Sequence, residues 1–326
     1  MRTLRWGLMG TARINRSIVP ALRAARGHEL VAVASRDGEK ARVHAEQWGI
    51  PRVVTSYEAL LAEPDIDVVY IPLPNHLHAE WTVRAAMAGK HVLCEKPMAL
   101  TVEEVDRIIA AADRTRIVVA EAFMYRHHPQ TLALRKLVTD GTIGELRFIR
   151  GSFSFNLDRP GDVRLDLTYG GGSLWDVGCY PVSLARVLAG AEPREVFGRA
   201  QRGPTGVDLQ FAGQLVFSDR LQAQFDCAFC APFRTEAELV GTTGAIRVIR
   251  PFKPGTKETL LLTRGSDIEE IVVDGHELYV GQVEDLGAAI REGTNPRVTL
   301  LDSRANTAAL VALYESARTG QPVSLG

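Results

Sequence analysis

The sequence has few cysteines, no long apolar run and no excess of one charge, and each absence excludes a class of protein. Four cysteines in 326 residues do not make the dense disulfide framework of a small secreted domain. We expect no membrane-spanning helix, because no uninterrupted apolar stretch reaches about 18 residues. Lys and Arg number 38 against 39 Asp and Glu, which favours neither nucleic acid nor membrane as a partner. The N-terminus lacks the pattern of a signal peptide, so we expect a cytoplasmic protein.

The cysteines and histidines that come in pairs do not have the pattern of a metal site. Cys227 and Cys230 form a C-x-x-C inside a predicted strand, where positions three apart point to opposite faces. No second cysteine pair is present to complete a zinc site. His127 and His128 are adjacent without an acidic cluster, and such histidines are rarely ligands. The sequence therefore predicts no bound metal and no redox role for the thiols.

The first part of the chain alternates short apolar strands with helical periodicity. Length and a composition of 46% hydrophobic and 24% charged residues fit a globular protein with two domains. Alternating strands and helices predict a parallel sheet with helices on both faces. We therefore expect a Rossmann domain over residues 1–121, with strands near 4–9, 30–35, 67–71, 91–94 and 117–121.

The pattern changes in the rest of the chain, where several strands follow one another through tight connections. A glycine-rich turn at 170–172 opens a predicted helix that ends near residue 188, and helices are expected near 279–292 and 302–318. Strands 213–217 and 221–229 read as an antiparallel hairpin. We expect a second, α+β domain over residues 122–326 with a mostly antiparallel sheet.

A degraded dinucleotide fingerprint lies between the first strand and the first helix. The pattern places glycine at its first, third and sixth positions, and here only Gly10 is kept, with Ala12 and Asn15 at the others. Gly10 permits a tight turn, and Ala12 is small enough for a pyrophosphate to approach the helix N-terminus. The alternative is a plain strand–helix turn with small residues for packing. The predicted cofactor-binding residues here are Gly10, Thr11, Ala12, Arg13 and Ile14.

The end of the second strand favours NADP as the cofactor. An NAD enzyme usually has Asp or Glu here to accept from the ribose 2′-hydroxyl, whereas this chain has Ser35 and Arg36. A hydroxyl and a guanidinium suit a 2′-phosphate. Asp37 follows and could reach the ribose instead, so NAD stays possible. Tyr57 is interpreted as a surface aromatic.

Two segments carry groups suited to acid–base chemistry. Lys96 lies in Glu95-Lys96-Pro97, after the fifth strand, on the carboxyl edge where open α/β sheets bind ligands. Asp176 and Tyr180 are four apart and share one helical face. A lysine beside a tyrosine would favour the phenolate and lower the phenol pKa toward working pH. The alternative is a solvated lysine, a helix-start aspartate and a half-buried tyrosine.

Together these motifs resemble the glucose–fructose oxidoreductase / inositol dehydrogenase / MocA (Gfo/Idh/MocA) family over essentially the whole chain. The resemblance is carried by residues 10–14, 71–78, 95–97, 121–129 and 176–180. Tyrosine at 180, with residues 121–126 upstream, is similar to the branch of dimeric dihydrodiol dehydrogenases and NADP-dependent D-xylose dehydrogenases. The resemblance implies Lys96 near the nicotinamide, Tyr180 as general acid–base and Asp176 on a substrate hydroxyl.

Further residues are expected at the two sites. Pro72, Asn75, His78 and Glu95 are predicted to contact the cofactor, although His78 could equally cap a helix start. Phe155, Arg164 and Trp175 are predicted to line the substrate pocket, with core packing as the alternative. Because relatives commonly dimerise through the open face of the second domain's sheet, we expect a homodimer or a higher homo-oligomer.

Three functions remain open at this point. The favoured one is NADP-dependent oxidation of a sugar or cyclic hydroxyl compound, such as an aldose of the D-xylose type, to a lactone. The second is reduction of a keto-sugar, an anhydro-sugar or a dihydrodiol-type compound. A nucleotide-linked sugar would need an anion site in the second domain, which Arg159 or Arg164 could supply. The third is a non-catalytic NADP sensor, against which Lys96, Asp176 and Tyr180 argue.

Overall fold

A computed structural model describes residues 2–325, which form two compact units. The first unit comprises the chain up to His127 together with Tyr279–Arg304, and the second comprises His128–Leu278 and the chain from Ala305 onward. This division differs from the expected one at residue 121, because a late segment returns to the first unit. In it, α8 (Val280–Glu292) packs against α1 (Asn15–Ala24). Strand–helix alternation in the sequence carries no signal for such a return.

The first unit contains a six-stranded parallel sheet of order β3-β2-β1-β4-β5-β6, which confirms the predicted Rossmann architecture. Its strands are β1 (Leu4–Met9), β2 (His28–Ala34), β3 (Arg52–Val54), β4 (Val68–Ile71), β5 (His91–Cys94) and β6 (Val119–Glu121). The connecting helices are α1, α2 (Gly38–Trp48), α3 (Tyr57–Ala62), α4 (Asn75–Met87) and α5 (Val102–Thr115). The short β3 was not predicted, since three residues are too few to show a period.

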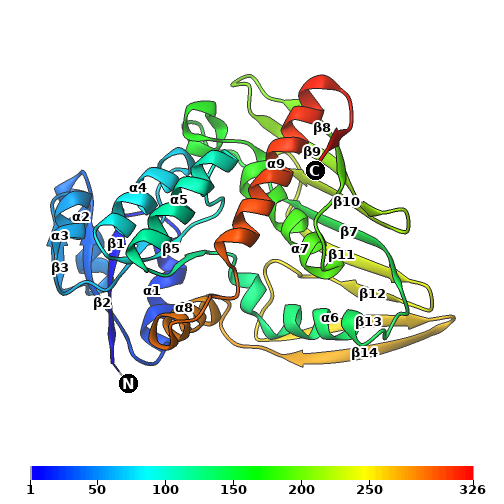
Figure 1. Ribbon diagram of the computed structural model, residues 1–326, viewed down its shortest axis with the longest axis horizontal. Helices are drawn as coiled ribbons and strands as arrows, with labels where there is room; N and C mark the ends of the chain where they lie inside the picture. Colours follow the sequence, from blue (N-terminus) through cyan, green and yellow to red (C-terminus); the bar gives the residue numbers. More distant parts are fainter. Residues whose placement is uncertain (1, 326) are drawn as a thin grey trace. The chain divides into compact units, whose positions relative to one another are not determined.

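Both faces of this sheet are buried, as parallel sheets require. Met9, Val69 and Ile71 join a core made with side chains of α3, α4 and α5. Their strand neighbours Leu8 and Tyr70 point to the opposite face and are also fully buried. Figure 1 shows α4 and α5 side by side against the sheet. The carboxyl ends of the strands meet at one edge, which positions the first part of the candidate site.

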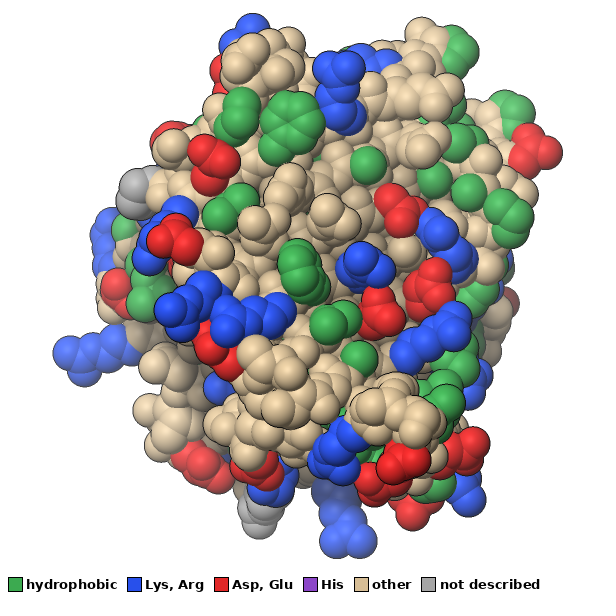
Figure 2. Space-filling view, turned by 90° about the vertical axis from the view of Figure 1, so that its right-hand side faces the viewer, with side chains coloured by type: hydrophobic (Ala, Val, Ile, Leu, Met, Phe, Trp, Pro, Cys, Tyr) green, Lys and Arg blue, Asp and Glu red, His purple; other side chains and the backbone are tan. Residues whose placement is uncertain are grey.

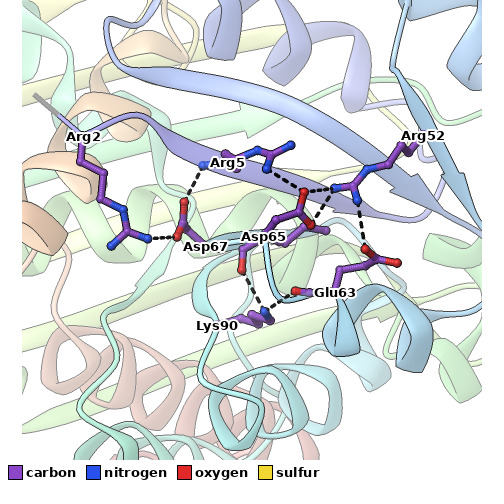
Figure 3. A network of polar contacts seen from close by, with 8 residues as sticks. Arg2, Arg5, Arg52, Glu63, Asp65, Asp67 and Lys90 are labelled. Atoms are coloured by element: carbon purple, nitrogen blue, oxygen red, sulfur yellow. Dashed lines mark hydrogen bonds and ion pairs between the residues drawn. The ribbon is translucent and has the colours of Figure 1, made fainter.

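The amino edge of the same sheet carries a network of ion pairs instead (Figure 3). The Arg52 guanidinium lies 3.0 Å from a Glu63 oxygen and 2.9 Å from an Asp65 oxygen, and Arg5 reaches Asp65 at 2.7 Å. Lys90 donates to the backbone oxygen of Glu63 at 2.6 Å. These side chains pair with one another and tie the amino ends of the strands together, so we assign them a structural role.

The second unit is built on a nine-stranded sheet of order β14-β13-β12-β11-β7-β10-β9-β8-β15. β7 (Leu146–Ser154) and β10 (Leu221–Ala228) pair in parallel, and the other neighbours are antiparallel, which confirms the predicted α+β half. The remaining strands are β8 (Glu195–Arg202), β9 (Asp208–Ser218), β11 (Arg234–Gly241), β12 (Ala245–Val248), β13 (Lys257–Arg264), β14 (Asp267–Asp274) and β15 (Val323–Ser324). The strands β8 and β15 were not predicted.

Helices cover one face of this second sheet. α7 (Cys179–Ala189) packs on β7 and β10, and α6 (Pro129–Thr139) packs on β14. The last helix, α9 (Leu300–Thr319), begins in the first unit and ends in the second.

The side of the molecule seen in Figure 2 mixes basic, acidic and hydrophobic side chains, with no single charge dominating.

The two cysteines of the C-x-x-C differ in their exposure. Cys227 is buried and Cys230 exposed, and both thiols are free. Among residues 2–325, no three His, Cys, Asp or Glu side chains are placed to hold a metal ion. Within the same residues, no helix is both long and apolar enough to cross a bilayer.

Candidate functional site

A pocket of about 480 Å³ opens at the carboxyl edge of the parallel sheet, in the first unit. The structure brings together six of the predicted cofactor residues there, namely Gly10, Thr11, Ala12, Ser35, Arg36 and Pro72. Its remaining lining comes from Asp37, Lys40, Tyr57, Leu73 and Pro74. Arg13, Ile14, Asn75, His78, Glu95 and Lys96 are not among the lining residues, and a cofactor contact of theirs stays a prediction.

The turn after β1 keeps its shape with one glycine of the expected three. Gly10 has a φ of +115°, a conformation that glycine adopts without strain, and a Cβ there would lie 3.3 Å from the Leu73 side chain. Asn15, where the fingerprint has its last glycine, is fully buried and donates from Nδ2 to the Gly10 oxygen at 2.9 Å. The asparagine amide closes the turn from inside, so this departure from the pattern is compatible with a dinucleotide turn. Sequence reasoning missed this role of Asn15.

The tip of β2 shows how Asp37 is used. Its carboxylate accepts hydrogen bonds from the backbone amides of Glu39 and Lys40, each at 3.1 Å, which makes it the N-cap of α2. The Lys40 amide hydrogen bond is the main cause that lowers the pKa of Asp37, and the Lys40 ammonium lies 3.4 Å away. Since the helix start occupies this carboxylate, the argument for a ribose 2′-hydroxyl partner is weakened. Arg36 and Lys40 give this end of the pocket a basic character suited to a phosphate.

Tyr57 is not the surface aromatic that the sequence suggested, and that interpretation is wrong. The residue is 6% exposed, lines the pocket together with Arg36, and its hydroxyl interacts with the Arg36 charge. It begins α3, whose N-cap Ser56 accepts from the Ala59 amide at 3.0 Å. Ser56 is a residue type that favours a helix start, so α3 could have been predicted here. The direction of the Tyr57 ring could not, because it depends on the neighbouring helices.

The loop that carries Lys96 is fixed by buried hydrogen bonds. The Lys96–Pro97 peptide is cis, and Glu121 accepts from the Met98 amide at 2.8 Å. Glu95 accepts from the Tyr70 hydroxyl at 2.5 Å. These contacts hold the residues on both sides of Lys96 at the carboxyl edge of β5.

His78 lies beneath this loop. Its ring is 1% exposed, and its two nitrogens lie 2.7 and 2.6 Å from the backbone oxygens of Pro97 and Leu73. Burial lowers the pKa of His78 to about 4. It links the loops after β4 and β5, and it makes no cap hydrogen bond at the start of α4.

In the second unit, Asp176 and Tyr180 stand on consecutive helical segments of different type. Asp176 belongs to a π-helical turn, Leu174–Gly178, and Tyr180 lies in the first turn of α7. Such π turns are rare in proteins overall, but where they occur they often lie at functional sites. The sequence predicted an uninterrupted α-helix here and gave no indication of the π turn. The Tyr180 ring is 4% exposed and packs edge-on to Phe153, with ring centres 5.3 Å apart.

Arg164 is held between two carboxylates of the same unit. Its guanidinium donates to Asp162 at 2.8 and 2.9 Å and lies 3.4 Å from an Asp176 oxygen. The Asp162 hydrogen bonds are the main cause that raises the pKa of Arg164, and Arg164 in turn lowers the pKa of Asp162. The guanidinium also lies over the Phe155 ring, 5.4 Å from its centre. Three predicted substrate residues, Phe155, Arg164 and Asp176, are thus brought together, while the fourth is not.

That fourth residue, Trp175, is 8% exposed and packs against Tyr314 at 5.3 Å, so it has the surroundings of a core residue. Beneath it, Asp208 accepts hydrogen bonds from Ser173 Oγ, the Leu174 amide and the Tyr314 hydroxyl, each at 2.7 Å. Burial raises the pKa of this carboxyl. Asp208 anchors the start of the π turn, and nothing in its local sequence distinguishes it from a turn aspartate.

A larger hollow of about 710 Å³ lies over β7–β12 on the second sheet. It is lined by paired polar groups, such as Arg150 with Glu238 at 3.2 Å and Ser152 with Asp226 at 2.8 Å. None of the predicted site residues lines it. The predicted catalytic pairing of Lys96 with Tyr180 joins residues of different units, and it stays a prediction.

Comparisons with known proteins match both units of the chain to oxidoreductases. Residues 4–123 match a family model described as an oxidoreductase family with an NAD-binding Rossmann fold, and residues 131–247 match a Gfo/Idh/MocA C-terminal domain. An uncharacterised oxidoreductase of Rhizobium meliloti is 40% identical over 98% of each chain. A D-xylose 1-dehydrogenase (NADP(+)) of Haloferax volcanii is 36% identical over 98% of this chain and 99% of the relative. A solved 3-ketoreductase of Actinomadura kijaniata, in complex with NADP and TDP-benzene, has a TM-score of 0.92 at 31% identity, covering 97% and 98% of the two chains.

Proposed function

The chain belongs to the Gfo/Idh/MocA oxidoreductase family, and on that premise we propose that it is an NADP-dependent dehydrogenase that oxidises a neutral aldose of the D-xylose type to its lactone. The first unit supplies the cofactor pocket and the second supplies the groups that recognise the substrate. The observation that carries the choice of a neutral substrate is that the charge of Arg164 is balanced by the carboxylates of Asp162 and Asp176.

The residues of the first pocket fit NADP. Gly10 allows the backbone to pass close to a pyrophosphate, and Thr11 and Ala12 lie in the turn that precedes α1, whose backbone amides attract anions. Arg36 and Lys40 would hold the 2′-phosphate, while Asp37 is engaged as a helix cap. The nicotinamide, when bound, supplies hydride acceptance or donation, and the protein supplies binding and orientation.

The charge balance beside Asp176 supports a neutral substrate. Arg164 carries one positive charge between the carboxylates of Asp162 and Asp176. Arg159, the other arginine considered for an anion site, adds one more positive charge near Asp162, so the four groups sum to zero. An anion site needs a surplus of positive charge, whereas the hydroxyls of a free sugar can donate to a carboxylate.

Tyr180 is proposed as the acid–base group of the reaction. Its oxygen would take the proton of the C1 hydroxyl as that carbon becomes a carbonyl, and would return it in the reverse direction. Asp176 would accept a hydrogen bond from a neighbouring hydroxyl and so fix the ring. Lys96 would favour negative charge on the reacting oxygens through its ammonium.

A second function keeps the same chemistry and changes the substrate. The similarity to a 3-ketoreductase favours reduction of a keto-sugar, and in that direction Tyr180 would donate its proton to the carbonyl oxygen. The dihydrodiol and anhydro-sugar alternatives use the same residues. A non-catalytic sensor would retain the cofactor pocket without needing Tyr180.

We also propose that the enzyme is a homodimer or a higher homo-oligomer joined through the open face of the second sheet. Phe148 shares the β7 face of Arg150 and Ser152, which line the 710 Å³ hollow, and it is 48% exposed. The mass in solution measured by light scattering tests this directly. A monomer at micromolar concentration would contradict the proposal.

The primary test measures nicotinamide absorbance with NADP⁺ or NAD⁺ against aldoses, polyols, dihydrodiols and a TDP-linked sugar. We expect reduction of NADP⁺ with D-xylose or a related free aldose, and no turnover of the nucleotide-linked compound. If only the TDP-linked sugar is turned over, the aldose dehydrogenase is overturned and the keto-sugar reductase becomes the favoured function.

The variant Asp162→Asn sharpens the same test, because it removes one of the two carboxylates that neutralise Arg164. Inorganic phosphate should compete with the aldose more strongly in this variant, with an inhibition constant several-fold lower than for the wild type. Asp166→Asn is the matched control, since Asp166 caps the next turn and bonds Thr168. Unchanged inhibition in the Asp162 variant would show that the Arg164 charge does not act on the ligand.

A further inference from the structure

We propose that Tyr57 is a positioning residue that holds Arg36 in place for the 2′-phosphate of NADP and thereby sets the preference for NADP over NAD. The inference rests on the proposed function, since it takes NADP as the cofactor. It begins from three observations: Tyr57 and Arg36 line the same pocket, the Tyr57 ring is almost fully buried, and its hydroxyl interacts with the Arg36 charge.

The ring of Tyr57 is fixed by helix packing. It meets Trp81 of α4 edge-on, with ring centres 5.0 Å apart. The Arg84 guanidinium lies over the Trp81 ring at 4.6 Å, and Arg84 pairs with Glu58, the residue after Tyr57, at 3.1 Å. With the ring held by α3 and α4, the hydroxyl has one accessible position, at the pocket.

That position is beside the glycine turn. The Tyr57 oxygen would lie 3.7 Å from a Cβ built on Gly10, which places it next to the backbone expected to carry the pyrophosphate. Burial raises the pKa of Tyr57, so the phenol keeps its proton at neutral pH. The oxygen can accept from Arg36 while its own O–H remains a donor.

Arg36 is exposed at the tip of β2, and an exposed arginine has many rotamers to lose when it binds a ligand. The rigid Tyr57 phenol in the same pocket can accept a hydrogen bond from it and so restrict it before the cofactor arrives, and the guanidinium keeps further N–H donors for the phosphate oxygens. NAD has no 2′-phosphate, so this arrangement should contribute little to NAD binding. The choice between the cofactors therefore depends on Tyr57 as well as on Arg36.

The experiment measures binding of NADP⁺ and NAD⁺ to Tyr57→Phe by calorimetry, with no sugar present. The phenylalanine keeps the ring on Trp81, so thermal stability should stay close to that of the wild type. We expect the Kd for NADP⁺ to rise about 5- to 10-fold, in line with one hydrogen bond that orders a charged group, and the Kd for NAD⁺ to change less than about twofold.

A double-mutant cycle separates positioning from direct contact. Arg36→Ala should weaken NADP⁺ more than Tyr57→Phe does, and adding Tyr57→Phe to Arg36→Ala should cost nothing further. Arg42→Ala, which removes a positive charge of α2 paired with Glu39, is the matched control and should leave both affinities unchanged.

The outcomes distinguish the inference from the proposed function. A wild type that binds neither cofactor would overturn the proposed function itself. A wild type that binds NADP⁺ normally, with Tyr57→Phe unchanged, would overturn the role of Tyr57 alone. Equal losses for NADP⁺ and NAD⁺ would also overturn it, because Tyr57 would then act on the part that both cofactors share.

Discussion

The two units build their candidate sites from different materials. In the first unit the pocket combines a backbone turn at Gly10 with the basic side chains of Arg36 and Lys40. In the second unit the site is made of side-chain charges that compensate one another, around Arg164 and beneath the π turn. The first unit thus holds the groups proposed to bind the cofactor, and the second holds the groups proposed to bind the substrate. We therefore expect changes in the two units to separate cofactor binding from chemistry and specificity.

The largest effect that would test this separation is in Tyr180→Phe. We expect kcat to fall by about 10²- to 10⁴-fold, the usual contribution of a positioned acid–base group. The Kd for NADP⁺ should be unchanged, because the pocket lies in the other unit. Steady-state kinetics and calorimetry on the same preparation measure both. Full turnover in the variant would remove Tyr180 from the reaction, and a weakened NADP⁺ affinity would break the separation.

A smaller effect compares two glycines. In Gly171→Ala the new Cβ would lie 2.5 Å from the Arg164 backbone oxygen, so the segment carrying Arg164 must shift. We expect the free energy of unfolding to fall by about 1–3 kcal/mol, as for overpacking of a filled site. Gly38→Ala, at the start of α2, meets nothing within 4 Å and should be neutral or stabilising by less than about 1 kcal/mol.

Urea denaturation of both glycine variants gives the comparison. Equal losses would show that the second unit tolerates change as well as the first. The Michaelis constant for the sugar should also rise in Gly171→Ala and stay constant in Gly38→Ala, since the altered segment carries Arg164.

The smallest effect is a pH dependence of the first unit. Burial, followed by the Arg291 charge, lowers the pKa of His28 from 6.5 to about 4. Trp6 donates to its Nδ1 at 2.9 Å, so the folded unit needs the neutral ring. In the unfolded chain this histidine takes up a proton below pH 6.5, so stability is complete above that pH and is lost as the pH falls toward 4.

The measurement is the Tm between pH 7 and 4, which should fall by a few degrees and fall less in His28→Gln. His78, whose pKa burial also lowers to about 4, accounts for part of the slope that remains. Hydrogen exchange should increase in β2 and α8 before it increases in β7. The opposite order would assign the acid sensitivity to the second unit.

The parallel sheet, the antiparallel sheet and six pocket residues could be predicted from the sequence, because periodicity and turn chemistry are local. Arg36 was placed at the pocket from its position at the tip of the second strand alone, and the structure has it in the lining. Asn15 replaces a glycine by a side-chain hydrogen bond, and a glycine pattern cannot register that. Asp208 acts through Ser173 and Tyr314, which are distant in the sequence and are brought near by the fold, so its position alone carried no signal.

The burial of Tyr57 and the boundary of the first unit were both missed for the same reason. The direction of the Tyr57 ring is set by Trp81, which lies on a different helix. The return of Tyr279–Arg304 is set by contacts of α8 with elements near the N-terminus. Long-range packing leaves no periodic trace in the residues that it places.

The discontinuity of the first unit has a consequence for how the protein is made. Ribosomes release a chain from its N-terminus, so the six strands of the parallel sheet emerge early, yet α8 emerges only after nearly the whole second unit. Until then the α1 side of the sheet lacks the helix that packs against it, and His28 lacks Arg291. The nucleotide-binding half is thus started first and completed late, and a premature stop before residue 280 would leave both halves unfinished.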